Sequence, residues 1–131
     1  MNQFAKFSVA VFTALTMGAP VLAQESAILG VWAPDKDSDY TISMCGAKGD
    51  RYCMEVTALR GGMRKPDYLQ YEGKYLVENA KAAGNGRFKG KINYFGVTGE
   101  VTATLTDPNT LRLKACAYFV VCKEITLKRK T

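Results

Sequence analysis

Apolar and polar residues alternate with a period of two along most of the chain beyond residue 27, and turn-forming residues separate the runs. Successive side chains of a β-strand point to opposite faces, so this alternation predicts strands that bury one face. We expect strands over residues 28–33, 40–45, 52–59, 74–77, 87–94, 100–106, 110–117 and 122–128. The single helical candidate is one turn over residues 78–83, which Gly84 would cap.

Many short strands within about 100 residues are typical of a sandwich or a closed barrel. A closed barrel leaves no exposed sheet edges, whereas a flat sheet of this many strands would expose two. We therefore predict an all-β fold, a small antiparallel meander β-barrel of about eight strands. The chain has no internal repeat, low-complexity tract or linker, which indicates a single domain.

Residues 1–23 have the pattern of a cleaved signal peptide. Lys6 precedes an apolar stretch over residues 7–17, and small residues stand before the expected cleavage position after Ala23. The alternative is an uncleaved membrane anchor, but the stretch is short for a hydrocarbon core of about 30 Å. We expect a periplasmic or secreted protein whose barrel domain is residues 24–131, without a lipid-anchor cysteine or a transmembrane segment.

The cysteines agree with export, because an even number in a small exported chain is typical of disulfides. Zinc is the rival interpretation, but the spacings are longer than those usual within a pair of structural zinc ligands. Three pairings of Cys45, Cys53, Cys116 and Cys122 exist. All four fall on the polar faces of their strands, and residues that face each other across a hairpin are close enough to bridge. We therefore expect Cys45–Cys53 and Cys116–Cys122, with no free thiol.

Composition narrows the chemistry, because the 131 residues include no His. This excludes a Ser-His-Asp triad, a Cys-His pair and a His-ligated metal. No pair of carboxylates has a spacing that indicates a glycosidase. We expect a protein that is not an enzyme and that has no cofactor.

Acidic residues cluster once, at Asp35, Asp37 and Asp39. Their spacing is similar to the start of a calcium-binding loop, but Tyr40 and Gly46 occupy the places where that loop needs Gly and Glu. We expect a solvated turn and no metal site.

The tripeptide Gly30-Val31-Trp32 resembles the G-x-W start of lipocalin-like (calycin) barrels. Arg129 stands where those barrels place an arginine across the tryptophan. The chain resembles more closely a family of small exported bacterial proteins known only as a domain of unknown function. That resemblance rests on these residues, on Cys45-Gly46 with Cys53, and on residues 88–94, 109–116 and 122–129.

The resemblance covers nearly the whole mature chain and implies a calycin-like barrel. The chain departs from the family pattern at Phe88 and Leu127, where the family has Trp, and it lacks an Asp-Pro turn after residue 94. These departures weaken any transfer of a binding surface. The family has no established activity to transfer.

Trp32 has two interpretations: it lines a ligand pocket, or it plugs one end of the barrel. We favour the plug, formed by Gly30, Trp32 and Arg129. Barrel closure brings the first strand beside the last, so we expect the Arg129 guanidinium over the Trp32 indole.

The barrel interior is either a dry core or a pocket for one small apolar ligand, since eight strands enclose little space. Apolar side chains that would line such a pocket are Met44, Met54, Met63, Tyr40, Tyr52, Tyr68, Tyr71, Tyr75 and Tyr94.

The net charge of +6 falls to +5 in the mature chain, because Lys6 is the only charged residue before the cleavage position. Arg60, Arg64 and Lys65 form a basic loop around Gly61-Gly62. This loop is a candidate surface for an anionic envelope component or another acidic partner. The alternative is an ordinary solvated loop, and export disfavours nucleic acid.

These features favour a non-catalytic periplasmic barrel that binds a small ligand or associates with the envelope, and that is a monomer. The alternative is a protein-interaction module, such as an inhibitor or immunity-type partner of another exported protein. An enzyme is the third and weakest hypothesis.

Overall fold

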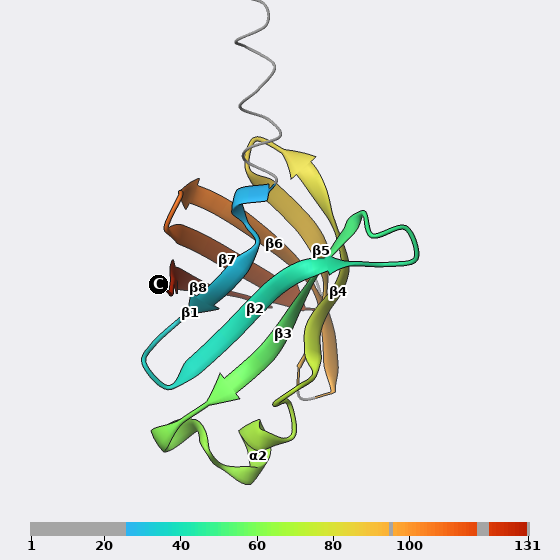
Figure 1. The fold of residues 1–131 in the computed structure, drawn as a ribbon. Coiled ribbons are helices and arrows are strands. Elements are labelled where there is room, and N and C mark those ends of the chain that lie inside the picture. Colours follow the sequence, from blue (N-terminus) through green and yellow to red (C-terminus); the bar gives the residue numbers. More distant parts are fainter. Residues whose placement is uncertain (1–25, 95, 118–120, 131) are drawn as a thin grey trace, which may run out of the picture.

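The computed structural model describes residues 26–94, 96–117 and 121–130. It confirms the predicted fold, a closed antiparallel barrel in which each of eight strands pairs with its neighbours in the sequence (Figure 1). The strands are β1 (Gly30–Ala33), β2 (Ser38–Cys45), β3 (Arg51–Leu59), β4 (Tyr75–Gly84), β5 (Arg87–Tyr94), β6 (Val97–Asp107), β7 (Thr110–Ala117) and β8 (Val121–Arg129).

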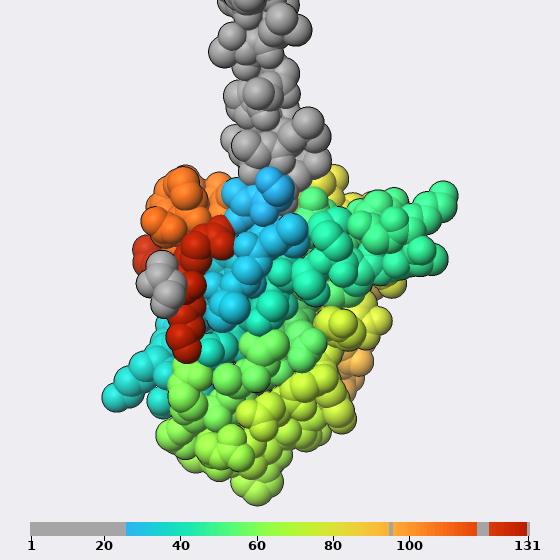
Figure 2. All heavy atoms as spheres, viewed as in Figure 1, coloured from blue at the N-terminus to red at the C-terminus, as the bar shows by residue number. Residues whose placement is uncertain are grey.

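Closure depends on a short ladder between the two ends of the chain. Trp32 of β1 pairs with Arg129 of β8, and Ala33 pairs with Lys128. The Lys130 amide also donates to the Val31 carbonyl at 2.9 Å. Figure 2 shows the last strand, in red, directly beside the blue first strand.

Inward-pointing residues of all eight strands fill the barrel. Trp32, Leu111 and Leu127 have 0% exposure, and Ile28 enters the barrel from the turn before β1 with 2% exposure. On β5 the inward position 90 is glycine, where a Cβ atom would lie 2.9 Å from the Ala80 Cβ. The interior therefore has no space for a side chain at this position.

The predicted helical turn at residues 78–83 is wrong, because β4 continues through this segment to Gly84. The pairing of β4 with β5 shifts register between Glu78 and Lys81, and Asn79 has a φ of 58°. This irregularity interrupts the alternation in the sequence. Hydrogen bonding to strands on both sides then outweighs the local preference.

Two short helical segments that we did not expect lie between β3 and β4. They are the 3₁₀ turn η1 (Gly61–Met63) and helix α2 (Pro66–Leu69), which cover the lower end of the barrel in Figure 1.

Both expected disulfides are present, and the described residues include no free cysteine. Cys116 and Cys122 pair directly across the β7–β8 hairpin. Cys45 and Cys53 lie diagonally, because Cys53 pairs with Ser43 in the ladder, and their Cα atoms are 5.9 Å apart. Strand parity therefore gave the right partners, although one bridge is not between directly opposed residues.

The predicted signal peptide, residues 1–23, lies outside the described residues. Within the described part of the chain, no helix has the length and apolar character needed to cross a bilayer.

Candidate functional site

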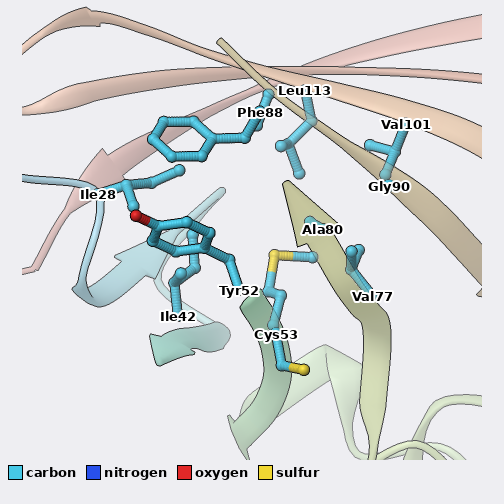
Figure 3. Close-up of a pocket in the computed structure, with 12 residues that line it drawn as sticks. Ile28, Ile42, Tyr52, Cys53, Val77, Ala80, Phe88, Gly90, Val101 and Leu113 are labelled. Atoms are coloured by element: carbon cyan, nitrogen blue, oxygen red, sulfur yellow. The ribbon is translucent and has the colours of Figure 1, made fainter. Parts of the chain in front are cut away.

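The apolar cavity inside the barrel has a volume of about 30 Å³. Figure 3 shows Phe88, Tyr52 and Ile28 crowded together on one side of it. The Tyr52 and Phe88 rings meet edge to face, with centroids 4.9 Å apart. An apolar cavity that binds benzene has a volume of about 150 Å³, so this cavity is too small for a ligand of that size.

Several of the predicted lining residues lie away from this cavity. Tyr52 and Met54 border it, but Met44 is 41% exposed and Tyr75 is 47% exposed. The inward alternation of β2 and β4 continues past the ends of the core, so aromatic and Met residues at the strand ends reach solvent.

The predicted contact between the first and last strands is present. The Arg129 guanidinium carbon lies 4.3 Å from the centroid of the Trp32 ring. Arg129 also donates to the carbonyls of Leu29 and Pro108, each at 3.0 Å, and to the carbonyl of Ala27. The indole Nε1 donates to the Ile28 carbonyl at 2.9 Å. Arg129 therefore ties three chain segments together over a buried Trp.

Gly30 leaves the space that this arrangement needs. A Cβ atom at position 30 would lie 2.9 Å from Arg129 Nη1, and the backbone φ of 128° also disfavours any other residue. The G-x-W pattern thus has a local cause: glycine admits the guanidinium, and the tryptophan two positions later supports it.

Asp39 is buried, with 8% exposure, and is not the solvated turn residue that we expected. Arg60 donates to both carboxylate oxygens, at 2.8 and 3.1 Å, and Lys130 donates at 2.8 Å. Hydrogen bonds from Arg60 and then from Lys130 lower the pKa of Asp39 from 3.8 to about 2, despite the opposing effect of burial. We call Asp39, Arg60 and Lys130 the carboxylate clamp.

The predicted anion-binding loop is mostly engaged within the protein. Arg60 belongs to the carboxylate clamp, and its Nε also donates to the Lys36 carbonyl at 3.1 Å. Arg64 donates to the Leu59 carbonyl at 3.0 Å and lies 3.6 Å from a Glu72 oxygen. Lys65 is exposed and forms no ion pair among the described residues. Two of the three cations therefore face internal partners, which disfavours this loop as an anion site.

A different group of cations gathers on the outer face of the barrel. Arg87 and Lys89 point outward from β5, and Arg112 and Lys114 point outward from β7. Between them β6 presents Thr102 and Thr104, because Lys89 pairs with Thr102, which pairs with Lys114, while Arg87 pairs with Thr104, which pairs with Arg112. We call these four cations the basic face.

One carboxylate borders the basic face: Glu124 of β8 lies opposite Lys114 in the ladder. Within the described part of the chain, Arg87, Lys89 and Lys114 form no ion pair. Arg112 lies 3.6 Å from a Glu124 oxygen, but both side chains are more than half exposed. Exposed pairs of this kind contribute about 0–1 kcal/mol, so Glu124 holds Arg112 only weakly.

The basic face also surrounds a hollow. The short threonines of β6 lie between long side chains on both sides, which leaves a groove of about 330 Å³. A second groove of about 480 Å³ shares Thr102 with it, and Lys89 lines this second groove together with Glu78 and Glu100. This site is not apparent from the sequence, because its cations come from two separate strands. The alternation Arg87-x-Lys89 and Arg112-x-Lys114 was the available signal.

Three tyrosines, Tyr40, Tyr71 and Tyr94, lie near one another. The Tyr71 and Tyr94 rings are 5.1 Å apart, and burial raises the pKa of both Tyr40 and Tyr94. The hydroxyl groups of Tyr40 and Tyr94 therefore stay protonated at neutral pH and add no charge.

Among the described residues there is no cluster of three or more Cys, Asp or Glu side chains that would hold a metal ion. In comparisons with protein-family models, curated proteins and solved structures, the chain has no significant match.

Proposed function

We propose that this protein is an exported, non-catalytic binding barrel of the cell envelope, and that it binds an anionic envelope component through its outer surface. The observation that carries the proposal is the basic face, where Arg87, Lys89 and Lys114 are exposed and unpaired among the described residues. A cluster of like charges raises the local concentration of oppositely charged ligands.

Two further observations support an external site. The interior cavity of about 30 Å³ is much smaller than the pockets of about 300–1,000 Å³ that usually hold small ligands. The two disulfides agree with an oxidising compartment such as the periplasm, where the predicted signal peptide would deliver the chain.

Binding to anionic probes at low salt tests the proposal. We expect the mature protein to bind heparin resin or phosphatidylglycerol vesicles, and to be released as salt rises, because screening weakens exposed charge pairs. The variant Arg87→Gln, Lys89→Gln, Arg112→Gln, Lys114→Gln should lose most of this binding.

The matched control is the variant Lys36→Gln, Lys48→Gln, Lys65→Gln, Lys74→Gln. It removes the same charge from exposed loop positions, and one of these positions belongs to the loop predicted from the sequence. The control should retain binding. The proposed function would be contradicted if the protein bound neither probe, or if both variants lost binding equally.

A further inference from the structure

The arrangement of charges on the basic face indicates the shape of its ligand. Neighbouring strands are about 4.8 Å apart, so the cations of β5 and those of β7 form two columns separated by about 10 Å. Within each column, alternate residues are about 7 Å apart along the strand. Thr102 and Thr104 lie in the trough between the columns.

The side chains in the trough suit a polar, linear molecule. Both threonines are half-buried, and their hydroxyl groups donate and accept hydrogen bonds. The long basic side chains on either side would contact anionic groups from both directions. A flat surface would meet the tips of these side chains but would not enter the trough.

One of the four cations, Lys89, is also placed where the sheet alone would not favour it, whereas Lys114 lies opposite Glu124. Lys81 of β4 lies directly opposite Lys89 of β5, and like charges in this position destabilise a sheet. Lys91, by contrast, lies opposite Glu100. A bound anion near Lys89 would offset the repulsion that the fold leaves in place.

The basic face lacks the apolar groups that membrane-binding surfaces use. Membrane-surface proteins usually combine cations with apolar side chains that enter the interface. The exposed large apolar residues of the described chain are Met44, Tyr75, Tyr94, Val97, Val121 and Ile125. None of them is at an outward position alongside Arg87, Lys89, Arg112 and Lys114 on β5–β7.

We propose that the basic face binds a linear polyanion, with the polymer lying along β6 between the cation columns of β5 and β7. The polymer carries phosphate, sulfate or carboxylate groups at intervals along its chain, and the threonine hydroxyls contact its polar backbone. This inference rests on the proposed function, because it specifies the anionic component that the same face binds.

The first test compares ligands of different length and shape. Heparin-derived octasaccharide and disaccharide serve as linear probes, and phosphatidylglycerol vesicles serve as a flat anionic surface. The octasaccharide should bind at least tenfold more tightly than the disaccharide, because a longer chain engages all four cations at once. The fourfold glutamine variant should reduce the slope of log affinity against log salt by roughly three to four.

The second test places one negative charge in the trough. Thr104→Glu should weaken octasaccharide binding at least tenfold, because its carboxylate would lie between the two cation columns. Ser43→Glu is the matched control, since Ser43 is exposed on the outer face of β2 and the charge change is the same. Circular dichroism and urea unfolding of both variants would show that they remain folded.

The outcomes separate this inference from the proposed function. Binding to vesicles with no preference for the octasaccharide, or equal losses in Thr104→Glu and Ser43→Glu, would overturn the linear polyanion and leave an anion-binding barrel. Octasaccharide binding that the loop variant loses as fully as the basic-face variant would overturn both. Absence of binding to every probe would also overturn both.

Discussion

The basic residues of this barrel form two groups that differ in what their charges face. Arg129 lies over Trp32 and donates to three carbonyls, while Arg60 and Lys130 hold the Asp39 carboxylate. By contrast, Arg87 and Lys89 project from the outer face of β5 and form no ion pair within the described part of the chain. The first group stabilises closure of the barrel, and the second is free to meet a ligand.

This difference means that charge alone does not identify a binding surface. Arg60 and Arg64 are close together in a glycine-containing loop, yet each already has partners within the protein. Arg87 and Arg112 are 25 positions apart in the sequence, yet strand pairing places both beside Thr104. Substitutions in the two groups should therefore affect different properties, stability in one and ligand binding in the other.

The largest expected effect is at the residue that supports Arg129. Trp32→Ala removes a fully buried indole and should lower the free energy of unfolding by about 3–5 kcal/mol. Urea unfolding followed by far-UV circular dichroism would measure it, since the substitution also removes the single Trp of the chain. Tyr75→Ala is the control, because Tyr75 is 47% exposed and should lose less than about 1 kcal/mol.

Arg129→Ala should lower the free energy of unfolding by about 2–3 kcal/mol, because it removes the stacking contact and leaves carbonyls of the turn before β1 without a donor. Arg129→Lys should restore only part of this, since an ammonium group lacks the planar fork. Arg87→Ala should change stability by less than about 0.5 kcal/mol. Equal losses at positions 129 and 87 would contradict the division into two groups.

Asp39→Asn should lower the free energy of unfolding by about 2 kcal/mol at neutral pH, because Arg60 and Lys130 lose their shared charge partner. The pKa of Asp39 is about 2 in the folded protein, against 3.8 ordinarily, so its carboxylate stabilises the fold above about pH 4. This contribution is lost as the pH falls from about 4 to about 2.

Urea midpoints at pH 5 and pH 2.5 would measure the effect. The difference between wild type and Asp39→Asn should be large at the higher pH and should shrink at the lower one. A difference that stays constant across this range would show that Asp39 is not ionised in the clamp.

The smallest expected effect has the opposite sign. Lys89→Gln removes a like-charge pair with Lys81 and should raise the free energy of unfolding by a few tenths of a kcal/mol at low salt. The gain should disappear at high ionic strength, where the repulsion is screened. Chemical unfolding at two salt concentrations would check this, and a loss of stability at low salt would indicate that Lys89 has an internal partner.

Much of the fold follows from the sequence because alternation records which face of each strand is buried. The same parity predicted both disulfides, and barrel closure predicted the contact of Trp32 with Arg129. The segment at residues 78–83 was predicted incorrectly, because a register shift breaks the alternation there. Local pattern is sufficient only where the pairing is regular.

The candidate site was less predictable, since it depends on contacts between distant positions. Asp39 reads as one member of an exposed acidic turn, and its burial follows from Arg60 and Lys130, which are 21 and 91 positions away. The basic face likewise depends on the register of β5, β6 and β7. Sequence alone supplies the charges, whereas the strand register decides which of them remain unpaired.

The most direct test of this account is an NMR titration of the ¹⁵N-labelled mature protein with the heparin octasaccharide. We predict that the largest changes in amide chemical shift occur at residues 87–89, 102–104 and 112–114. The amide chemical shifts of Arg60 and Lys130 should change little on binding. Strong shifts at residues 60–65 with none on β5–β7 would contradict the claim that the unpaired cations form the binding surface.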